Sequence, residues 1–310
     1  MKVLVTGASG FVGRAVVAAL AAQGDEVRAA IRVPSDAGGD RTTGAAFPPG
    51  VTIVRHSDLG AGVDWTDPLA GTDAVVHLAG IAHAGPGIPE QRYDRVNHHA
   101  TAALAAAARD AGVSRFVFVS SIRAQTGPAA DHVVSERDTP RPTDAYGRSK
   151  LAAERAVTAS GVPFTILRPV LVYGPGVKGN LRALMRLAAL PIPLPFGALK
   201  ARRSLVSLAN LASAIGFVLR QPACAGETYV VADPEPLMIG EIVTALRRGR
   251  GRPPGLVAVP EALLRLALTA VGRGINWEQI SGGLVADPAK LMAAGWRPER
   301  DTMKALAEMG

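Results

Sequence analysis

The chain has 310 residues, of which 48% are hydrophobic and 19% are charged. This composition is typical of a globular protein and excludes a disordered, collagen-like or solenoid chain. Its apolar stretches are shorter than the roughly 20 residues that a membrane-spanning helix needs. A single cysteine, Cys224, excludes an internal disulfide and a multi-cysteine metal site. We therefore expect a cytoplasmic enzyme or binding protein that makes no integral membrane contact.

The chain is basic, with 34 Lys and Arg residues against 26 Asp and Glu residues. Most of the arginines are scattered and only 5% of the residues are aromatic, so we expect no nucleic-acid partner. One dense basic run, residues 247–252, has two interpretations. It is either a solvated loop, or a segment that attracts phosphate-bearing substrates or an anionic membrane surface.

Strand-like and helix-like segments alternate over the first half of the chain, as a parallel sheet with crossover helices requires. We expect strands at residues 2–6, 26–31, 51–54, 74–78, 115–120 and 163–168. We expect helices at residues 11–23, 91–111 and 144–160. The pattern predicts an α/β fold with a Rossmann-like, doubly wound parallel sheet.

Proline and glycine interrupt the chain after residue 168, and helical patterns dominate from there. We therefore place a domain boundary near residue 170. Residues 1–170 form the expected dinucleotide-binding domain, and residues 171–310 form a smaller, mostly helical C-terminal lobe that binds substrate. Segments near residues 204–232 are expected to return to the main sheet, so the lobe is discontinuous.

The first strand-like run leads into a glycine-rich loop, Thr6–Gly13, that opens a predicted helix. Gly7 permits a tight turn, Gly10 lets the backbone approach a pyrophosphate, and Gly13 lets the helix pack closely on the strand. The unpaired N–H groups at the start of the helix then face the diphosphate. The loop predicts a dinucleotide site, which also includes Ser9, Phe11 and Val12.

The second predicted strand lacks the terminal acidic residue that bonds the ribose hydroxyls in NAD-binding folds. It ends in Arg32, which could pair with a 2′-phosphate through charge-assisted hydrogen bonds. We therefore expect a preference for NADP(H) over NAD(H).

Three further residues predict redox chemistry at a carbonyl or hydroxyl group. Tyr146 and Lys150 lie four residues apart on a predicted helix, so both project from one face. A nearby ammonium group and an oxidised nicotinamide ring would lower the pKa of the phenol, which is otherwise a poor base at neutral pH. Ser121 follows a predicted strand at the ligand-binding edge of the sheet and could hydrogen-bond the reacting oxygen.

Together these motifs resemble those of the extended short-chain dehydrogenase/reductases, in particular the NAD-dependent epimerase/dehydratase family that acts on nucleotide sugars. The resemblance covers nearly the whole chain, and it implies that Ser121, Tyr146 and Lys150 are catalytic. It also implies a set of residues that bind the cofactor. Besides the loop, Tyr146 and Lys150, this set comprises Asp58, Leu59, Leu78, Ala79, Gly80, Asn97, Ser120, Pro169 and Val172.

The same resemblance implies a nucleotide-linked sugar, most simply a UDP-sugar, as the substrate. Family dehydratases carry an Asp-Glu pair after the catalytic hydroxyl, where this chain has Ile122 and Arg123, which argues against dehydration. The implied substrate contacts are Ser121, Arg123, Tyr146, Asn180, Leu181 and Arg203.

We expect hydride transfer at a hexose carbon, most simply C4, with NADP or NAD as the cofactor. An epimerase would retain its cofactor and return the hydride to the other face of the sugar. A 4-keto-sugar reductase would instead consume NADPH in a single transfer. A non-catalytic dinucleotide sensor or scaffold is the third hypothesis.

Two expectations concern assembly and metals. The alanine-rich segments 100–108 and 151–159 expose small side chains, and the resemblance implies a homodimer in which they form a four-helix bundle. His83, His98 and His99 lack acidic or cysteine partners at ligand spacing, so we expect no metal site.

Overall fold

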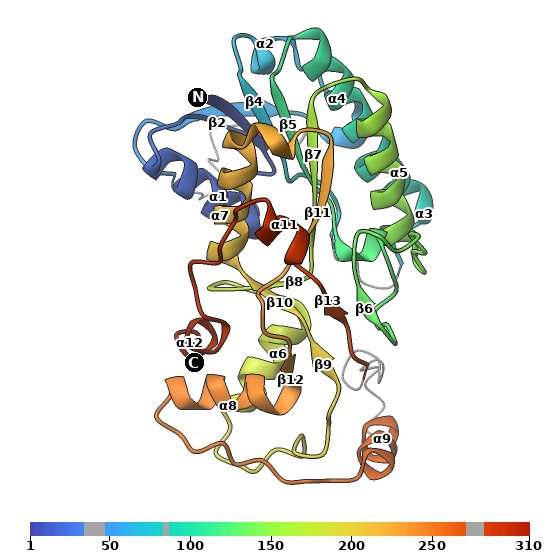
Figure 1. The fold of residues 1–310 in the computed structure, drawn as a ribbon, viewed down its shortest axis with the longest axis vertical. Coiled ribbons are helices and arrows are strands. Elements are labelled where there is room, and N and C mark those ends of the chain that lie inside the picture. Colours follow the sequence, from blue (N-terminus) through green and yellow to red (C-terminus); the bar gives the residue numbers. More distant parts are fainter. Residues whose placement is uncertain (34–46, 83–86, 271–281) are drawn as a thin grey trace.

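The computed structural model describes residues 1–33, 47–82, 87–270 and 282–310. A parallel seven-stranded sheet, in the order β11-β7-β5-β4-β1-β2-β3, forms its centre, with helices on both faces (Figure 1). The order runs outward from β1 in both directions, which confirms the predicted doubly wound fold. The strands are β1 (Lys2–Thr6), β2 (Glu26–Arg32), β3 (Thr52–His56), β4 (Ala74–His77), β5 (Arg115–Val119), β7 (Phe164–Pro169) and β11 (Glu227–Val231).

The six strands expected before residue 170 are all present, each within two residues of its expected ends. Two of the three expected helices are likewise continuous, as α1 (Phe11–Ala22) and α5 (Ala145–Ala159). The third is divided into α3 (Glu90–Tyr93), a π-helical turn η2 (Asp94–His99) and α4 (Ala100–Asp110). Hydrophobic periodicity does not reveal such a turn, because one extra residue shifts the helical register only locally.

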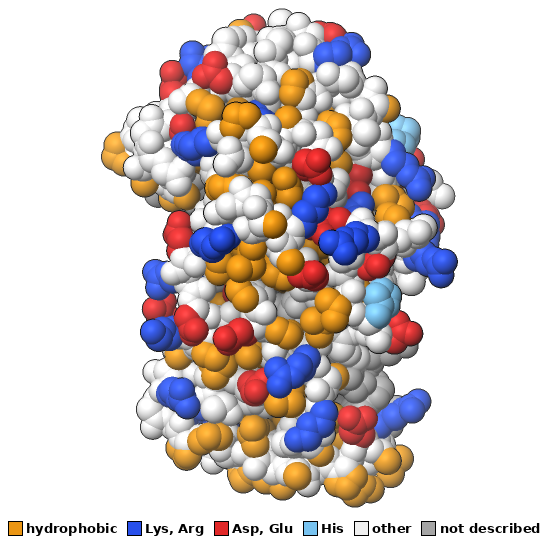
Figure 2. Space-filling model, viewed as in Figure 1, with side chains coloured by type: hydrophobic (Ala, Val, Ile, Leu, Met, Phe, Trp, Pro, Cys, Tyr) orange, Lys and Arg blue, Asp and Glu red, His pale blue; other side chains and the backbone are white. Residues whose placement is uncertain are grey.

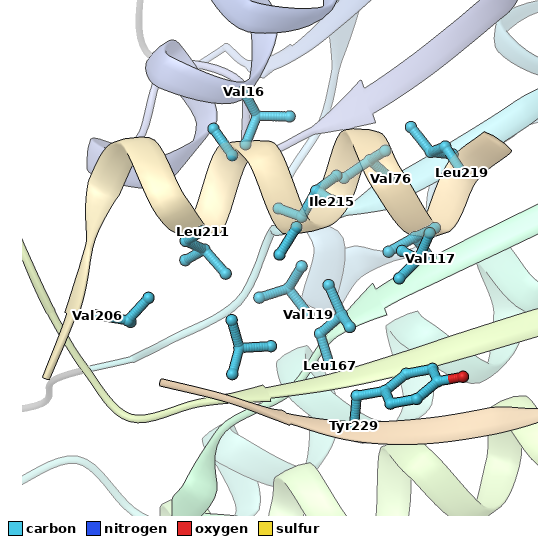
Figure 3. Packing of buried hydrophobic residues seen from close by; sticks show 14 of the residues in the cluster. Val16, Val76, Val117, Val119, Leu167, Val206, Leu211, Ile215, Leu219 and Tyr229 are labelled. Carbon is cyan, nitrogen blue, oxygen red and sulfur yellow. The ribbon is translucent and has the colours of Figure 1, made fainter. Parts of the chain in front are cut away.

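Helices cover both faces of the sheet because successive side chains of a strand point to opposite faces. In β1, Val3 and Val5 belong to the hydrophobic cluster with α1 and α7 (Leu208–Arg220). Leu4 belongs to the cluster on the other face, with α4 and α5. Figure 3 shows the first cluster, in which helix residues pack against strand residues: Val16, Leu211, Ile215, Val76 and Val117.

A smaller, mostly helical lobe carries its own hydrophobic cluster, which includes Leu194, Ile242 and Leu246. Its helices are α6 (Gly179–Ala188), α8 (Ile239–Gly249), α9 (Glu261–Ala270) and α12 (Thr302–Ala307). Short two-stranded sheets join β8 (Leu171–Tyr173) to β10 (Leu205–Ser207) and β9 (Arg202–Arg203) to β12 (Leu237–Met238). The remaining elements are η1 (Leu59–Ala61), α2 (Thr66–Leu69), η3 (Ile122–Ala124), β6 (Val133–Val134), η4 (Pro222–Cys224), β13 (Val285–Ala286) and α11 (Ala289–Ala293).

The segments near residues 204–232 divide between the sheet and the lobe. β11 joins the main sheet as the neighbour of β7, and α7 packs on one face of that sheet. The exception is β10, which pairs with β8 outside the main sheet because both strands lie beyond the carboxyl end of β7. The domain boundary at residue 170 stays a prediction. Within the described ranges, no helix combines the length and apolar character that crossing a bilayer demands.

A buried carboxylate, Asp233, ties the end of β11 to the lobe. It accepts hydrogen bonds from the Tyr173 hydroxyl at 3.0 Å, the Ser207 backbone N–H at 3.1 Å and the Asn210 side-chain amide at 2.7 Å. Thr302 of α12 adds a fourth donor at 3.3 Å. Burial raises the pKa of Asp233, and the hydrogen bonds from these donors oppose this effect by stabilising the charged carboxylate inside the protein.

Two glycine substitutions test how closely α1 approaches the first strand. A Cβ atom at Gly13 would lie 2.1 Å from the Gly7 carbonyl oxygen. One at Gly216 in α7 would instead meet the ends of two flexible side chains, Gln23 at 3.1 Å and Arg220 at 3.6 Å. Gly13→Ala should therefore lower the free energy of unfolding by about 1–3 kcal/mol. Gly216→Ala should leave it unchanged or raise it by up to about 1 kcal/mol through helix propensity. Urea unfolding without cofactor measures both, and wild-type stability in Gly13→Ala contradicts this packing.

Candidate active site

The turn between β1 and α1 carries the glycine-rich loop. Gly7 adopts a φ of +68°, and a Cβ atom there would lie 2.8 Å from the backbone nitrogen of Ala79. Gly10 caps α1 without a side-chain hydrogen bond, so no side chain of the cap occupies the N–H groups of the first turn. These backbone donors and the absence of side chains at the glycines fit a diphosphate.

The other loop residues divide between the two hydrophobic clusters. Phe11 is half-buried and packs against the cluster of the C-terminal lobe, whereas Val12 packs against the sheet cluster. The Ser9 carbonyl accepts a hydrogen bond of 3.0 Å from Arg14 Nε. The loop is therefore fixed from both sides.

Four adjacent strands end at the same edge of the sheet, in the order β5-β4-β1-β2. The chain reverses its direction of winding between β1 and β4, which is where ligands bind in doubly wound sheets. The structure brings to this edge the loop after β1, Arg32, Leu78–Gly80 and Ser120–Ser121.

Asn97 joins the loop after β4 to the first turns of α5. It lies in the π-helical turn η2 and is 1% exposed. Its Oδ1 accepts from the Ile81 N–H at 2.7 Å, and its Nδ2 donates to the Ile81 carbonyl at 3.1 Å and to Ser149 Oγ at 3.0 Å. Ser149 Oγ in turn donates to the Tyr146 carbonyl at 2.8 Å. Asn97 thus positions two segments that lie on either side of the sheet edge.

A buried histidine, His77, completes this hydrogen-bonded network. Thr101 Oγ1 uses its only proton on the Asn97 carbonyl, at 2.6 Å. His77 Nε2 must then donate to Thr101 Oγ1, at 2.8 Å, and His77 Nδ1 accepts from Thr6 Oγ1, at 2.6 Å. Burial and the nearby Lys150 charge lower the pKa of His77 to about 3, so the ring is neutral. The roles of Thr6 and Thr101 were missed by the sequence analysis.

The three expected catalytic side chains converge at the carboxyl end of β5. Ser121 caps η3, its Oγ accepting from the Arg123 backbone N–H at 3.2 Å. The Ser121 hydroxyl lies close enough to the Tyr146 phenol to act on its pKa. Burial raises the pKa of Tyr146, the Ser121 hydroxyl lowers it, and the charges of Asp144 and Arg123 act in opposite directions. The phenol is therefore protonated at neutral pH in this state.

Lys150 is 5% exposed, although it carries an ammonium group. Its Nζ donates to the Val119 carbonyl at 3.0 Å and lies 4.6 Å from the centre of the Phe118 ring. Burial lowers the pKa of Lys150 to about 8, against the opposing effect of the Glu154 carboxylate. A buried lysine with a lowered pKa in a ligand crevice is typical of a functional group.

The carboxylate that faces Lys150 along α5 is itself paired. Arg168 of β7 donates through Nε to Glu154 Oε1 at 3.0 Å and through Nη2 to Oε2 at 2.5 Å. Both side chains are less than a tenth exposed. Arg168 also bonds Gln125. This ion pair fixes α5 against β7, the strand that ends at Pro169.

Asp144 is a site residue that the sequence analysis missed. Its Oδ1 caps α5 by accepting from the Gly147 N–H at 2.7 Å, and its Oδ2 pairs with Arg123 Nη2 at 2.6 Å. An Asp at the first position of the helix predicted over residues 144–160 was the available signal. Two polar atoms of the segment that follows β5, Ser120 Oγ and Arg123 Nη1, are buried and have no hydrogen-bond partner within the described residues. Such orphaned donors fit a polar ligand.

The residues expected to hold the adenosine end lie at the surface. Arg32 Nη1 is 3.2 Å from Asp58 Oδ2, and both side chains are about half exposed. Asp58 also caps η1 by accepting from the Gly60 N–H at 2.8 Å. Leu59 packs against the cluster beneath α4 and α5.

The remaining predicted residues lie beyond the sheet edge. Pro169 ends β7 and Val172 lies on β8. Asn180 and Leu181 lie in the first turn of α6, where Leu181 is buried in the lobe. Arg203 lies on β9, and burial lowers the pKa of its guanidinium.

The expectation that His98 and His99 lack an acidic partner is wrong. Asp94 accepts from both rings, at 2.8 Å from His98 Nδ1 and 3.0 Å from His99 Nε2. In an α-helix, residues five apart point in different directions, whereas the wider π-turn brings both histidines beside Asp94. The three ligand atoms lie within 4.8 Å of one another. His83 lies outside the described residues.

Comparisons with known proteins agree with this site. The model of the NAD dependent epimerase/dehydratase family matches residues 3–232. UDP-glucose 4-epimerase from Vibrio cholerae is 34% identical over 96% of this chain and 90% of its own. The 3-beta-hydroxysteroid dehydrogenase of Mycolicibacterium neoaurum is 30% identical over 91% of this chain and 78% of its own.

A solved structure extends the likeness to the whole fold. MoeE5 in complex with UDP-glucuronic acid and NAD superimposes with a TM-score of 0.75 at 25% identity, over 99% of this chain and 97% of that chain. The family model covers most of the residues that form the glycine loop, the sheet edge and the Ser-Tyr-Lys cluster. The chain therefore belongs to the NAD-dependent epimerase/dehydratase family, and it is an enzyme.

Proposed function

We propose that this enzyme transfers a hydride at C4 of the hexose of a UDP-sugar and acts as a 4-epimerase. The observation that carries the proposal is the convergence of Ser121, Tyr146 and Lys150 beside the glycine-rich loop. The similarity to a UDP-glucose 4-epimerase and to a protein solved with UDP-glucuronic acid and NAD supports the substrate class. A non-catalytic sensor has no need of a buried lysine beside a tyrosine, so this hypothesis loses its support.

The dinucleotide is proposed to lie across the sheet edge. The diphosphate would bind the loop Gly7–Gly13, the adenosine end would lie at Arg32 and Asp58, and the nicotinamide half would bind Ser120 and Lys150. The orphaned Ser120 hydroxyl and the uncapped start of α1 support this placement. When bound, the nicotinamide ring accepts and returns the hydride.

The chain's own residues are proposed to move the proton. Tyr146 takes the proton of the C4 hydroxyl and returns it, while Ser121 holds the reacting oxygen through its hydroxyl, which lies beside the phenol. The buried Lys150 ammonium, which now bonds the Val119 carbonyl, would hold the nicotinamide ribose and would favour the phenolate by its charge. Arg123 stabilises the phenolate further, and Asp144 fixes Arg123. Arg203 and Asn180 are proposed to hold the nucleotide half of the substrate from the lobe.

A homodimer through α4 and α5 is also proposed. Thr101, Leu104, Ala105 and Ala108 of α4 are buried against the sheet. The opposite side of this helix carries small side chains, with Ala103 exposed, which permits a second helix to approach closely.

A 4-keto-sugar reductase is the second candidate. Arg32 at the tip of β2 favours an exchangeable NADPH, and the relative from Mycolicibacterium neoaurum carries the name of a dehydrogenase. The two candidates differ in whether reduced cofactor is consumed.

A Tyr146→Phe variant tests the reaction and its base together. Wild-type protein incubated with UDP-glucose and a catalytic amount of cofactor should form the 4-epimer, and the loss of the phenol should lower turnover by about 10²–10⁴-fold. Chromatography of the sugar nucleotides measures both. Stoichiometric loss of reduced cofactor with a UDP-4-keto sugar, and no epimer, would instead select the reductase. Near-normal turnover in Tyr146→Phe would contradict the proposed base.

An Arg32→Gln variant tests the cofactor preference. The exposed Arg32–Asp58 pair is worth at most about 1 kcal/mol, so a 2′-phosphate can displace Asp58. The variant should lose about 10-fold or more in kcat/KM or affinity for NADP(H) and change little with NAD(H). Equal losses with the two cofactors, or a wild-type preference for NAD(H), would overturn the NADP(H) assignment.

A Lys150→Met variant tests the buried ammonium group. The pKa of Lys150 falls from 10.5 to about 8 on folding, so its charge destabilises the folded chain below about pH 8, and this penalty disappears as the pH rises towards 10.5. The variant should therefore be more stable than wild type at pH 7, by about 2 kcal/mol, and lose this advantage by pH 10. Thermal unfolding across this range measures it, with the exposed Lys304→Met as control. A difference that does not change with pH contradicts the burial of the charge.

A further inference from the structure

Two chain segments of the C-terminal lobe, residues 182–200 and 247–266, extend to the end of the lobe that lies farthest from the sheet, and we call them the distal surface (Figure 1). Their backbones pair side by side: the Leu194 N–H donates to the Gly255 carbonyl and the Val257 N–H donates to the Leu194 carbonyl, each at 2.9 Å. Backbone hydrogen bonds therefore hold together two segments of the distal surface that are far apart in the sequence.

Arg247, the first residue of the basic run, fastens these segments together. It is 4% exposed and donates to the carbonyls of Leu190 and Ile192 on one segment and of Pro254 and Gly255 on the other, at 2.6–3.1 Å. Arg247 therefore has a structural role, which differs from both interpretations of the basic run, a solvated loop and a segment that attracts anionic ligands. The remaining arginines of the run, Arg248, Arg250 and Arg252, are exposed.

Large apolar side chains concentrate on the distal surface. Eleven large hydrophobic residues of the described chain are exposed, and six of them lie here. The two most exposed are Leu266 and Leu263 of α9, at 68% and 58%, while the neighbouring Leu264 is 6% exposed and packs inward. Figure 2 shows hydrophobic side chains along the lower edge of the molecule, where α8 and α9 lie in Figure 1. The six residues are Leu187, Leu190, Ile192, Val257, Leu263 and Leu266.

Positive charge concentrates on the same two segments. They hold eight Lys or Arg residues and a single acidic residue, Glu261, in a chain whose formal net charge is +8. The rest of the chain is therefore close to neutral. Exposed members include Arg182 and Arg186 on α6 and Arg265 on α9.

We propose that the distal surface docks the enzyme on an anionic lipid bilayer. Exposed leucines flanked by arginines match a membrane interface, where apolar side chains enter the acyl boundary and guanidinium groups bind headgroup phosphates. Leu263 and Leu266 lie three residues apart, on one face of α9, as an interfacial helix requires. This docking is independent of the catalytic chemistry and places the sheet edge away from the lipid.

Two other occupants fit less well. A second copy of this chain would bring together two surfaces that each carry most of the chain's net positive charge, and like charges repel across an interface. A nucleic acid would use the arginines but leave the exposed leucines in water, and the two segments supply a single aromatic residue, Phe196, which is buried. An anionic bilayer satisfies both groups of side chains.

Vesicle co-sedimentation of the full chain tests the proposal. At about 0.1 M salt the protein should sediment with phosphatidylcholine vesicles that contain about 30% phosphatidylglycerol, and should remain in solution with phosphatidylcholine alone. Raising the salt to about 1 M should weaken binding, because the Debye length falls to about 3 Å.

Two pairs of variants separate the apolar and the charged contributions. Leu263→Glu with Leu266→Glu should weaken vesicle binding by about 100-fold, because the variant lacks the two leucine side chains that would enter the bilayer. Arg248→Gln with Arg250→Gln should weaken it by about 30-fold, at about fivefold for each arginine. The matched controls, Ile53→Glu on β3 and Arg137→Gln with Arg141→Gln, change exposed residues elsewhere and should bind as wild type.

Size-exclusion chromatography with light scattering and binding to duplex DNA complete the test. Four results would each overturn the proposal: no binding to the anionic vesicles, binding that survives both variant pairs, a smaller oligomer in the leucine variant, or DNA binding that needs the arginines but not the leucines. All variants should keep the wild-type circular dichroism and the wild-type turnover of soluble substrate. A variant that fails this check is replaced by Leu263→Ser with Leu266→Ser, which removes the same apolar surface without adding charge.

Discussion

The docking of the first turn of α5 against the short helix η3 at the end of β5 is the contact on which the active site depends. A Cβ atom at Gly147 would lie 2.3 Å from the Arg123 carbonyl, so the two backbones are as close as a glycine allows. This approach brings the Tyr146 phenol to the Ser121 hydroxyl and lets Asp144 bind both the Gly147 N–H and Arg123. One backbone contact thereby fixes the Tyr146 phenol, the Ser121 hydroxyl and the Arg123 guanidinium together.

Buried polar groups then hold the rest of the sheet edge in register with this contact. The chain of hydrogen bonds from Thr6 through His77 and Thr101 to Asn97 connects β1, β4 and the helix before α5. Each of these groups is inside the protein, where an unpaired donor or acceptor would cost about 1–3 kcal/mol. Their complete pairing makes the edge rigid before any ligand arrives, which is what an active site needs in order to orient its groups.

The features that the sequence made visible share a local origin. The β strands were recognisable as short β-branched or aromatic runs, and the loop Gly7–Gly13 and the Tyr146–Lys150 pair each lie within one short segment. The parts that were missed depend on contacts between segments. Asp144 meets Arg123 from 21 residues away, and Asp94 meets His99 only because a π-turn interrupts the helix. The charge of residues 247–252 was visible, but the inward position of Arg247 was not.

By itself, the sequence determined the doubly wound fold and the glycine-rich turn after β1, because hydrophobic periodicity and glycine spacing act over a few residues. It also proposed Ser121, Tyr146 and Lys150 as the residues that act together at the end of β5. Only the tertiary structure decided the electrostatics. Burial sets the pKa of Lys150 near 8 and keeps His77 neutral, and burial results from packing by the whole chain. The tertiary structure also decided that residues 182–200 and 247–266 form one basic and apolar surface, because backbone pairing between residues 194 and 257 joins the two segments.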